Sequence, residues 1–333
     1  MRELFAIDGE ARQLACERDQ IFQLSAVDGE RYILRFTNPT EDPSITNFQT
    51  EALLHVARVA PTLPIPHIIR SVAGETDVTV VMEDGRISMA RVITFLPGVP
   101  LCQVPQRAGN IRLAMAVTLA ELGFAFRGFF HSAAGHEVPW DLKHAASLRG
   151  LLHHIKDDVT RQLATQGLDN FERYAKPQEE KLRCQVIHND LNFSNVMIDE
   201  HQDQICGIID FGDMVHAPLI YDVAVALAYH LSGDDENTLA IMVDFVSAYH
   251  CVVPLEEEEL AILYDLVVMR QVMTLTITER RASLHPENRD YILRNHPVAL
   301  KAIKRLAKLD RREAARAFFQ ACPGYITHSV KVA

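Results

Sequence analysis

The N-terminal part of the chain alternates short apolar runs with polar turn residues, a pattern typical of antiparallel strands. Residues 21–26 and 32–36 form one pair of runs, and Asp28-Gly29 between them favours a tight hairpin turn. Residues 76–82 and 88–95 form a second pair. We therefore expect a small antiparallel sheet in this part of the chain.

One helix interrupts these strands. Residues 48–59 place apolar side chains at helical spacing, and several prolines follow directly. Leu96-Pro97-Gly98 is expected to be a hinge, because proline and glycine punctuate the end of a strand. The pattern predicts an α+β fold with a small β-rich lobe over residues 1–95 and a larger, mainly helical lobe over residues 96–333.

Beyond residue 105 the apolar spacing is mostly helical. Three short apolar runs, 185–187, 196–198 and 205–209, interrupt the helices and predict strands, with a polar turn at 199–204. The expected helices lie at 111–130, 148–166, 170–182, 219–231, 237–249 and 255–282, and shorter helices follow to about residue 321.

The segment from His188 to Asn195, followed by Asp210-Phe211-Gly212, carries the most specific pattern in the chain. Asp190, Asn195 and Asp210 have the spacing of a kinase-type active site. In such a site the first Asp accepts the proton of the attacking hydroxyl, and the Asn and the second Asp hold Mg²⁺ against the phosphates of ATP. Mg²⁺ prefers oxygen ligands, which both side chains provide. The strands beside the loop are expected to bring Asn195 and Asp210 close together.

Three nearby residues allow more than one interpretation. His188 is expected to support the loop through hydrogen bonds rather than to act as an acid or base. Asp213 fits either a substrate contact or the N-cap of the next helix. Trp140, the only tryptophan, is expected to be a packing residue rather than a platform for substrate.

Composition and charge narrow the class of protein. The 333 residues are 48% hydrophobic and 23% charged, which is ordinary for a globular enzyme. A net charge of −11 argues against a nucleic-acid partner or an anionic membrane surface, and it suits a small cationic substrate. The six cysteines are scattered without CxxC or zinc-site spacing, so we expect reduced thiols.

The sequence gives no sign of export. Its first eight residues become acidic too early for a secretory signal, and we expect no apolar run long enough to span a membrane. The acidic run 256–259 is expected to be a solvated cap at a helix start rather than a cation site. We expect a cytoplasmic protein whose partner is a small-molecule substrate and neither nucleic acid nor a membrane. The oligomeric state has no signature in the sequence.

On these residues the chain resembles the aminoglycoside phosphotransferase family, whose members have a bilobal, protein-kinase-like fold and phosphorylate small molecules with ATP. The resemblance covers about residues 14–229, and it is strongest over residues 186–222. Within the family, the chain looks most like the hydroxylysine kinase-type branch. The stretches that suggest this branch are Glu17-Arg18-Asp19-Gln20, residues 38–51, Trp140-Asp141-Leu142 and residues 210–222.

The resemblance implies a role for each matching residue. Asp190 matches the catalytic base, and Asn195 and Asp210 match the Mg²⁺ ligands. Asp222 matches the acid that holds the backbone of the catalytic loop. Residues 1–95 would then bind the nucleotide, and residues 96–333 would carry the catalytic loop, the metal site and a helical substrate pocket.

The nucleotide-binding part departs from the family pattern. Glu51 matches the acid that pairs with a strand lysine, but Arg35 stands where that lysine is expected. Arg35 keeps the charge and can fork onto a phosphate or onto Glu51. The backbone near Ile93 and Phe95 would face the adenine. The glycine-rich loop is replaced by a polar stretch in which Arg18 either contacts a phosphate or pairs on the surface.

The predicted function is an ATP- and Mg²⁺-dependent transfer of phosphate to a hydroxyl group of an amino alcohol or a hydroxy amino acid such as hydroxylysine. Choline, homoserine and aminoglycosides stay open as acceptors. A protein kinase is disfavoured, because the eleven residues between Asp210 and Asp222 leave no room for an activation segment. A catalytically silent nucleotide-binding protein is the competing interpretation, supported by Arg35 and the missing glycine loop.

Overall fold

The chain forms two compact units that interleave along the sequence. The computed structural model describes residues 1–323 except 15, 17–18, 105–109, 200–203 and 232–236. The expected lobe boundary near residue 95 stays a prediction, because compactness alone assigns no function to either unit. Unit 1 comprises Met1–Ala108, Ala125–His136 and Phe193–Met214, and unit 2 comprises Gly109–Phe124, Glu137–Asn192 and Val215–Ala333.

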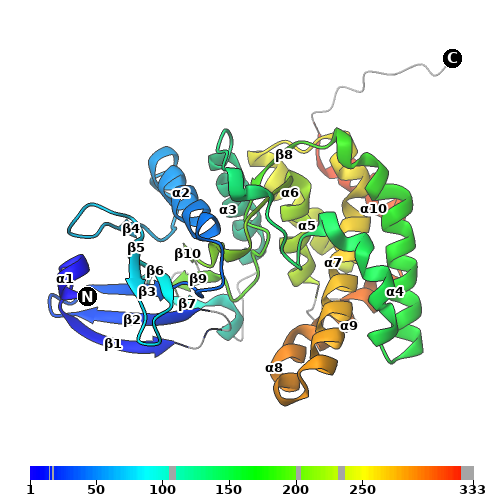
Figure 1. The fold of residues 1–333 in the computed structure, drawn as a ribbon. Coiled ribbons are helices and arrows are strands. Elements are labelled where there is room, and N and C mark those ends of the chain that lie inside the picture. Colours follow the sequence, from blue (N-terminus) through cyan, green and yellow to red (C-terminus); the bar gives the residue numbers. More distant parts are fainter. Residues whose placement is uncertain (15, 17–18, 105–109, 200–203, 232–236, 324–333) are drawn as a thin grey trace. The chain divides into compact units, whose positions relative to one another are not determined.

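Unit 1 is built on an antiparallel sheet (Figure 1). Its strands are β1 (Gly9–Leu14), β2 (Gln20–Ala26), β3 (Arg31–Phe36), β4 (Ile68–Ile69), β5 (Val78–Val81) and β6 (Ile87–Thr94). The order is β1-β2-β3-β6-β4, and β5 also pairs with β6. Leu24, Leu34 and Val92 are buried in the small core of this sheet. Both predicted hairpins are therefore confirmed, the first with Gly29 at a φ of 91°.

The helix of unit 1 begins earlier than expected. α2 runs over Pro43–Val59 because Asp42 caps its start by accepting a hydrogen bond from the backbone N–H of Ser44 at 2.9 Å. Proline at the first helical position is favourable, since it has no N–H to leave unpaired. Phe48 and Val56 are fully buried on one face of this helix.

A second sheet of unit 1 contains two of the predicted strands. Its strands are β7 (Val99–Pro100), β9 (Val196–Asp199) and β10 (Gln204–Ile208), in the order β10-β9-β7. Most of the polar turn expected at 199–204 lies outside the described residues. Gly98 directly precedes β7 and has a φ of 94°. A Cβ at this position would lie 2.5 Å from both the carbonyl oxygen of Ile198 and Sγ of Cys206. Only glycine fits this position.

Unit 2 is mainly helical and also contains one two-stranded sheet, in which β8 (Cys184–Ile187) pairs with β11 (Val215–Pro218). α7 is its central helix and contacts most of the others. The helices are α3 (Ile111–Ala125), whose last residue belongs to unit 1, α4 (Asp158–Asn170), α5 (Leu219–His230), α6 (Thr238–Val252), α7 (Glu257–Leu284), α8 (Arg289–Ile292), α9 (His296–Leu306) and α10 (Arg311–Ala321).

The structure corrects one expectation about α7 and part of a second. By length and composition it is apolar enough to cross a membrane, although 89% of its most apolar window is buried in the protein, as in a core helix. The acidic run at its start is only partly solvated. Glu256 and Glu259 form a capping box, and the buried Glu259 pairs with Arg183 at 2.6 Å.

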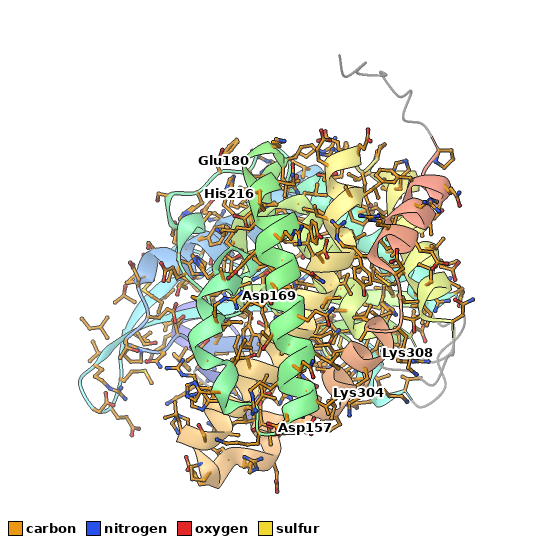
Figure 2. All side chains as sticks on the ribbon, turned by 90° about the vertical axis from the view of Figure 1, so that its right-hand side faces the viewer. Asp157, Asp169, Glu180, His216, Lys304 and Lys308 are labelled. Carbon is orange, nitrogen blue, oxygen red and sulfur yellow. The ribbon has the colours of Figure 1, made fainter. Side chains whose placement is uncertain are left out.

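The helices expected at 148–166 and 170–182 are divided differently. A 3-10 helix covers Leu142–His154, and α4 starts only after Asp157 (Figure 2), which caps it by accepting from the backbone N–H of Thr160 at 2.8 Å. Beyond α4 the chain continues in a π-helical turn and a 3-10 helix. α3 ends at Ala125 instead of residue 130, and the chain turns at Gly128 with a φ of 77°.

Candidate active site

A buried carboxylate holds the backbone of the catalytic loop in unit 2. Asp222, in the first turn of α5, accepts hydrogen bonds from the backbone N–H groups of His188 at 3.1 Å and Asn189 at 2.8 Å. The expected role of Asp222 is therefore confirmed. Desolvation raises the pKa of Asp222 to about 6, and the two N–H bonds oppose that rise. Asn189 adopts a φ of 65°, a conformation that few residues other than glycine tolerate.

Asp190 is contacted at both carboxylate oxygens. Its Oδ2 accepts a hydrogen bond from Nδ2 of Asn192 at 2.9 Å, and its Oδ1 lies 3.6 Å from Nη2 of Arg270. Its backbone N–H donates to Nδ1 of His188 at 3.3 Å, in agreement with the supporting role expected of His188. The side chain of Asp190 keeps 19% exposure, so its position is fixed while solvent still reaches it.

Arg270 is a residue at this loop that the sequence interpretation missed. It lies in the middle of α7, and its side chain is 3% exposed. Its guanidinium carbon lies 5.0 Å from the ring centre of Trp140 and 5.8 Å from that of Tyr229, and Nη2 donates to the Tyr229 hydroxyl at 3.1 Å. A lone arginine after the apolar run 266–269 was the available signal, because a buried charge requires a partner.

Asn195 and Asp210 lie at one end of the β9–β10 pair in unit 1. Val196 pairs with Ile208, so the residues just outside this pair face each other, and the N–H of Ile209 donates to the carbonyl of Asn195 at 2.9 Å. Asp210 follows with a φ of 63°, and its Oδ1 accepts from the backbone N–H of Gly212 at 3.3 Å. The strand pairing therefore places Asp210 one residue beyond the backbone partner of Asn195, which agrees with the expected proximity, and their joint binding of a metal stays a prediction.

These two side chains have the donor chemistry of a magnesium site. Asn195 offers an amide oxygen and the exposed Asp210 offers a carboxylate. Two protein ligands suffice for Mg²⁺ where phosphates and water complete the octahedron. Within the described residues, three or more His, Cys, Asp or Glu side chains nowhere gather into a group that could hold a metal ion.

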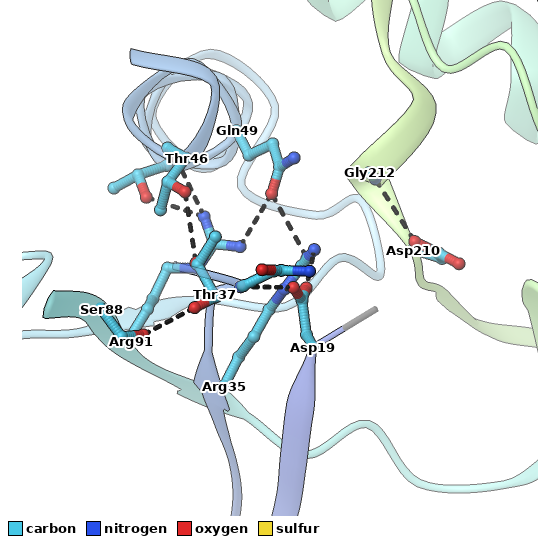
Figure 3. Close-up of polar contacts among 11 residues, drawn as sticks. Asp19, Arg35, Thr37, Thr46, Gln49, Ser88, Arg91, Asp210 and Gly212 are labelled. Carbon is cyan, nitrogen blue, oxygen red and sulfur yellow. Dashed lines mark hydrogen bonds and ion pairs between the residues drawn. The ribbon is translucent and has the colours of Figure 1, made fainter. Parts of the chain in front are cut away.

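Arg35 contacts an acid other than the expected one (Figure 3). It forms an ion pair with Asp19, and its Nη1 donates to Oε1 of Gln49 at 3.3 Å. Glu51 is exposed on α2. Residues 49 and 51 lie on opposite faces of this helix, so Glu51 points away from the face that carries Gln49. The interpretation that Arg35 pairs with Glu51 is thus replaced by pairing with Asp19, and a nucleotide role for either residue stays a prediction.

A second arginine joins this network. Arg91 faces Arg35 across the β3–β6 pair and is buried. Its guanidinium donates to Oγ1 of Thr50 at 2.8 Å and to Oε1 of Gln49 at 3.1 Å, and burial lowers the pKa of Arg91 to about 10. Figure 3 shows both arginines reaching Gln49, with Asp210 on a separate segment of unit 1.

Ile93 and Phe95 lie where the sheet of unit 1 ends. Ile93 pairs with strands on both sides of β6, and the N–H of Phe95 donates to the carbonyl of Arg31 at 3.1 Å. Their contact with an adenine stays a prediction. The expected contact of Arg18 lies outside the described residues.

Asp213 does not cap the next helix. It ends a short 3-10 helix, Phe211–Asp213, and β11 separates that turn from α5, whose N-cap is Pro218. The N-cap interpretation of Asp213 was wrong because the sequence pattern did not reveal β11. A substrate contact stays the prediction for this half-buried side chain.

Curated relatives of this chain are kinases that act on small molecules. The hydroxylysine kinase of Mus musculus is 22% identical over 316 residues, which cover 90% of this chain and 82% of the relative. The homoserine kinase of Methylobacillus flagellatus is 28% identical over 234 residues, or 70% of this chain and 67% of the relative.

Solved structures show the same fold. An amicoumacin kinase in complex with AMP-PNP, Ca²⁺ and its ligand has a TM-score of 0.69 at 15% identity and covers 94% of each chain. A microcompartment-associated aminopropanol kinase has a TM-score of 0.66 at 17% identity and covers 95% of this chain and 94% of its own. At such identities the likeness confirms the expected kinase-like α+β fold.

Most of the sequence matches one family. Residues 12–263, well over half of the chain, match the phosphotransferase enzyme family, abbreviated APH. This agrees with the resemblance seen in the motifs and with the kinase names of the relatives. The chain belongs to the phosphotransferase enzyme family, as a small-molecule kinase with the protein-kinase-like fold.

Proposed function

We propose that this kinase transfers the γ-phosphoryl group of ATP to the hydroxyl of a small amine, either an amino alcohol or a hydroxy amino acid such as hydroxylysine. The observation that carries the proposal is the state of Asp190, whose carboxylate is held by Asn192 and Arg270 yet remains partly exposed. A general base needs a fixed and accessible carboxylate. Asp190 would accept the proton of the acceptor hydroxyl while its oxygen bonds to the γ-phosphorus and ADP leaves.

The proposed metal and nucleotide contacts come from unit 1. Asn195 and Asp210 supply oxygen donors of the kind that Mg²⁺ takes. The backbone bond between Asn195 and Ile209, the residue before Asp210, supports this pairing of ligands. Mg²⁺ bound there would neutralise phosphate charge. Arg35 would contact a phosphate, and the backbone near Ile93 and Phe95 would face the adenine.

The names of the relatives support the acceptor class. Hydroxylysine kinase, homoserine kinase and aminopropanol kinase are all named for amines that carry a hydroxyl group. A cationic acceptor also agrees with the net charge of −11. We propose that Asp213 holds the ammonium group of the acceptor, since its half-buried carboxylate would favour a positive charge beside it.

One observation favours a second candidate, a nucleotide-binding protein without turnover. Arg35 is already engaged by Asp19, so a nucleotide phosphate would have to compete with a carboxylate for it. Retention of Asp190, Asn195 and Asp210 favours the active enzyme, because mere nucleotide binding has no need for a base.

The test is ADP release from Mg-ATP with acceptors offered in matched pairs that differ by one hydroxyl. Hydroxylysine is compared with lysine, homoserine with 2-aminobutyrate, and aminopropanol with propylamine. We expect turnover with one hydroxylated member, none with its partner, and loss of turnover in Asp190→Asn.

Three outcomes of this test distinguish the candidates. Turnover that survives in Asp190→Asn would overturn the assignment of the base. Equal ADP release with both members of every pair would indicate hydrolysis rather than transfer. If ATP binds but no ADP is formed with any acceptor, the silent nucleotide-binding protein is favoured.

A further inference from the structure

Arg270 occupies an unusual place for a charged side chain. It lies within the central helix α7, among residues that are almost all buried, and its own side chain is 3% exposed. Burying a guanidinium is costly unless charge and hydrogen bonds compensate it. Its position therefore depends on the groups that surround its planar end.

Two aromatic rings hold this guanidinium in place. Its carbon lies 5.0 Å from the ring centre of Trp140 and 5.8 Å from that of Tyr229, both within the range of a cation–π contact. The Tyr229 hydroxyl also accepts a hydrogen bond from Nη2 at 3.1 Å. The arginine thus comes from one helix, Tyr229 from a second, α5, and Trp140 from the segment before the 3-10 helix Leu142–His154.

The same Nη2 atom faces the proposed base. It lies 3.6 Å from Oδ1 of Asp190, while Nδ2 of Asn192 donates to Oδ2 from the other side. Asp190 is the exposed member of the pair and Arg270 the buried one. A ligand arriving from solvent would therefore meet the carboxylate, and the arginine would act on the reaction only through that carboxylate.

We propose that Arg270 is a positioning residue that holds the carboxylate of Asp190 in the orientation required for proton transfer from the acceptor hydroxyl. This inference rests on the proposed function of Asp190 as the base. Trp140 and Tyr229 fix the guanidinium, the guanidinium and Asn192 fix the carboxylate, and Asp222 fixes the loop backbone beneath them. Rate depends steeply on such placement, since an error of about 1 Å costs roughly 100-fold.

The chain offers a matched control on the same helix. Asp265 of α7 forms an ion pair with Arg311 at 2.6 Å, and the guanidinium carbon of Arg311 lies 4.0 Å from the ring centre of Tyr174. The chemistry is the same, with one arginine, one aspartate and an aromatic ring, and one partner of each pair is buried. None of these three residues belongs to the proposed site.

The experiment compares Arg270→Met with Arg311→Met in the full chain, by steady-state kinetics and thermal unfolding. Both variants should lose stability, because each leaves an aspartate without its arginine. Only Arg270→Met should lower kcat, by roughly 10- to 100-fold, with KM values for ATP and acceptor nearly unchanged. Arg270→Lys should recover part of the loss, because it restores the charge without the planar fork.

A double variant tests whether Arg270 acts through Asp190. In an Asp190→Asn background, Arg270→Met should lower the residual kcat little further, since groups that act as a unit are not additive. A full additional loss in that background would show an independent role and overturn the inference.

Failure of the inference and of the proposed function are distinguishable. If Asp190→Asn abolishes turnover and Arg270→Met leaves kcat within about twofold, the base stands and the positioning role is wrong. If Arg311→Met lowers kcat as much as Arg270→Met, general loosening explains the effect and the inference is overturned. Turnover that persists in Asp190→Asn would instead contradict the proposed base.

A milder variant keeps the test decisive if Arg270→Met fails to fold. Tyr229→Phe removes one hydroxyl that contacts Arg270 and keeps the aromatic ring. We expect a kcat loss of a few fold, because one of the contacts that fix the guanidinium is lost. An unchanged kcat in this variant would overturn the positioning role.

Discussion

Two arginine–aspartate pairs, one in each unit, are exposed in opposite ways. In the pair of Arg35 and Asp19 the arginine side chain is 25% exposed and the aspartate 3%. In the pair of Arg270 and Asp190 the arginine is 3% exposed and the aspartate 19%. The exposed member is thus a cation in unit 1 and an anion in unit 2.

This difference follows the chemistry proposed for each unit. A phosphate is anionic and needs an accessible cation, whereas a hydroxyl that loses its proton needs an accessible carboxylate. In each pair the buried member fixes the exposed one, and burial of one partner strengthens their attraction by excluding water. An arginine–aspartate pair can therefore serve either ligand. The more exposed arginine suits a phosphate, and the more exposed aspartate suits a hydroxyl.

Removing the exposed carboxylate should have the largest effect. We expect Asp190→Asn to lower kcat by about 10²- to 10⁴-fold, because positioned general bases contribute that much. The dissociation constant for ATP, measured by calorimetry, should stay nearly unchanged, since the proposed nucleotide contacts lie in unit 1. A large change in ATP affinity with normal kcat would show that Asp190 serves nucleotide binding rather than proton transfer.

Asp222 differs from both aspartates of these pairs, because backbone N–H groups rather than an arginine contact its buried carboxylate. The pKa of Asp222 is raised from 3.8 to about 6, so the native state binds more protons than the unfolded state between pH about 4 and 6. The stability that this group contributes therefore falls as pH rises through that window and is constant above it. Its slope is at most about 1.4 kcal/mol per pH unit.

Asp222→Asn should remove this dependence, because an amide does not titrate in that range. Urea unfolding of both proteins at pH 4, 5, 6 and 7 gives the difference in free energy of unfolding. We expect the advantage of the wild-type chain over Asp222→Asn to shrink from pH 4 to 6. A difference that stays flat across the window would contradict the raised pKa.

Removing the exposed arginine of unit 1 should change binding rather than rate. We expect Arg35→Met to raise the KM for ATP by about tenfold, which corresponds to losing one hydrogen bond to a charged group. In contrast to Arg270→Met, kcat should change little. Steady-state kinetics with varied ATP tests this, and a loss in kcat alone would remove the contrast between the two arginines.

The smallest effect is expected from the buried acid of unit 1. Asp19→Asn keeps an acceptor for the backbone N–H of Asn38, which lies 2.9 Å from Oδ1, and removes the charge that competes for Arg35. ATP should bind a few fold more tightly, because the charge of Arg35 is then no longer shared with a carboxylate. Calorimetric titration with ATP would settle the direction, and weaker binding would show that Asp19 orients Arg35 for the phosphate.

Local sequence patterns were sufficient for the local structure. The Asp28-Gly29 dipeptide predicted its hairpin, and the apolar runs located β9 and β10. Helix ends were less accurate where capping residues were overlooked, as with Asp42 before α2 and Asp157 before α4. These errors arise because apolar spacing marks the buried face of a helix and not its first turn.

The site was predictable where a motif or the family resemblance named its residues. The spacing of the motif indicated Asp190, and the resemblance implied Asp222, whose hydrogen bonds to the loop the structure bears out. The partners of the charged side chains were not visible, because tertiary packing chooses them. Arg270 reaches Asp190 from α7, and Glu259 pairs with Arg183 across 76 residues of sequence.

The ring that holds Arg270 has a practical use. Trp140 is the only tryptophan of the chain, and it lies against the arginine that contacts Asp190. Ultraviolet fluorescence excited at tryptophan therefore originates from one place, beside the proposed base. The protein carries a built-in optical reporter there, so acceptor arrival can be followed by stopped-flow emission without any label.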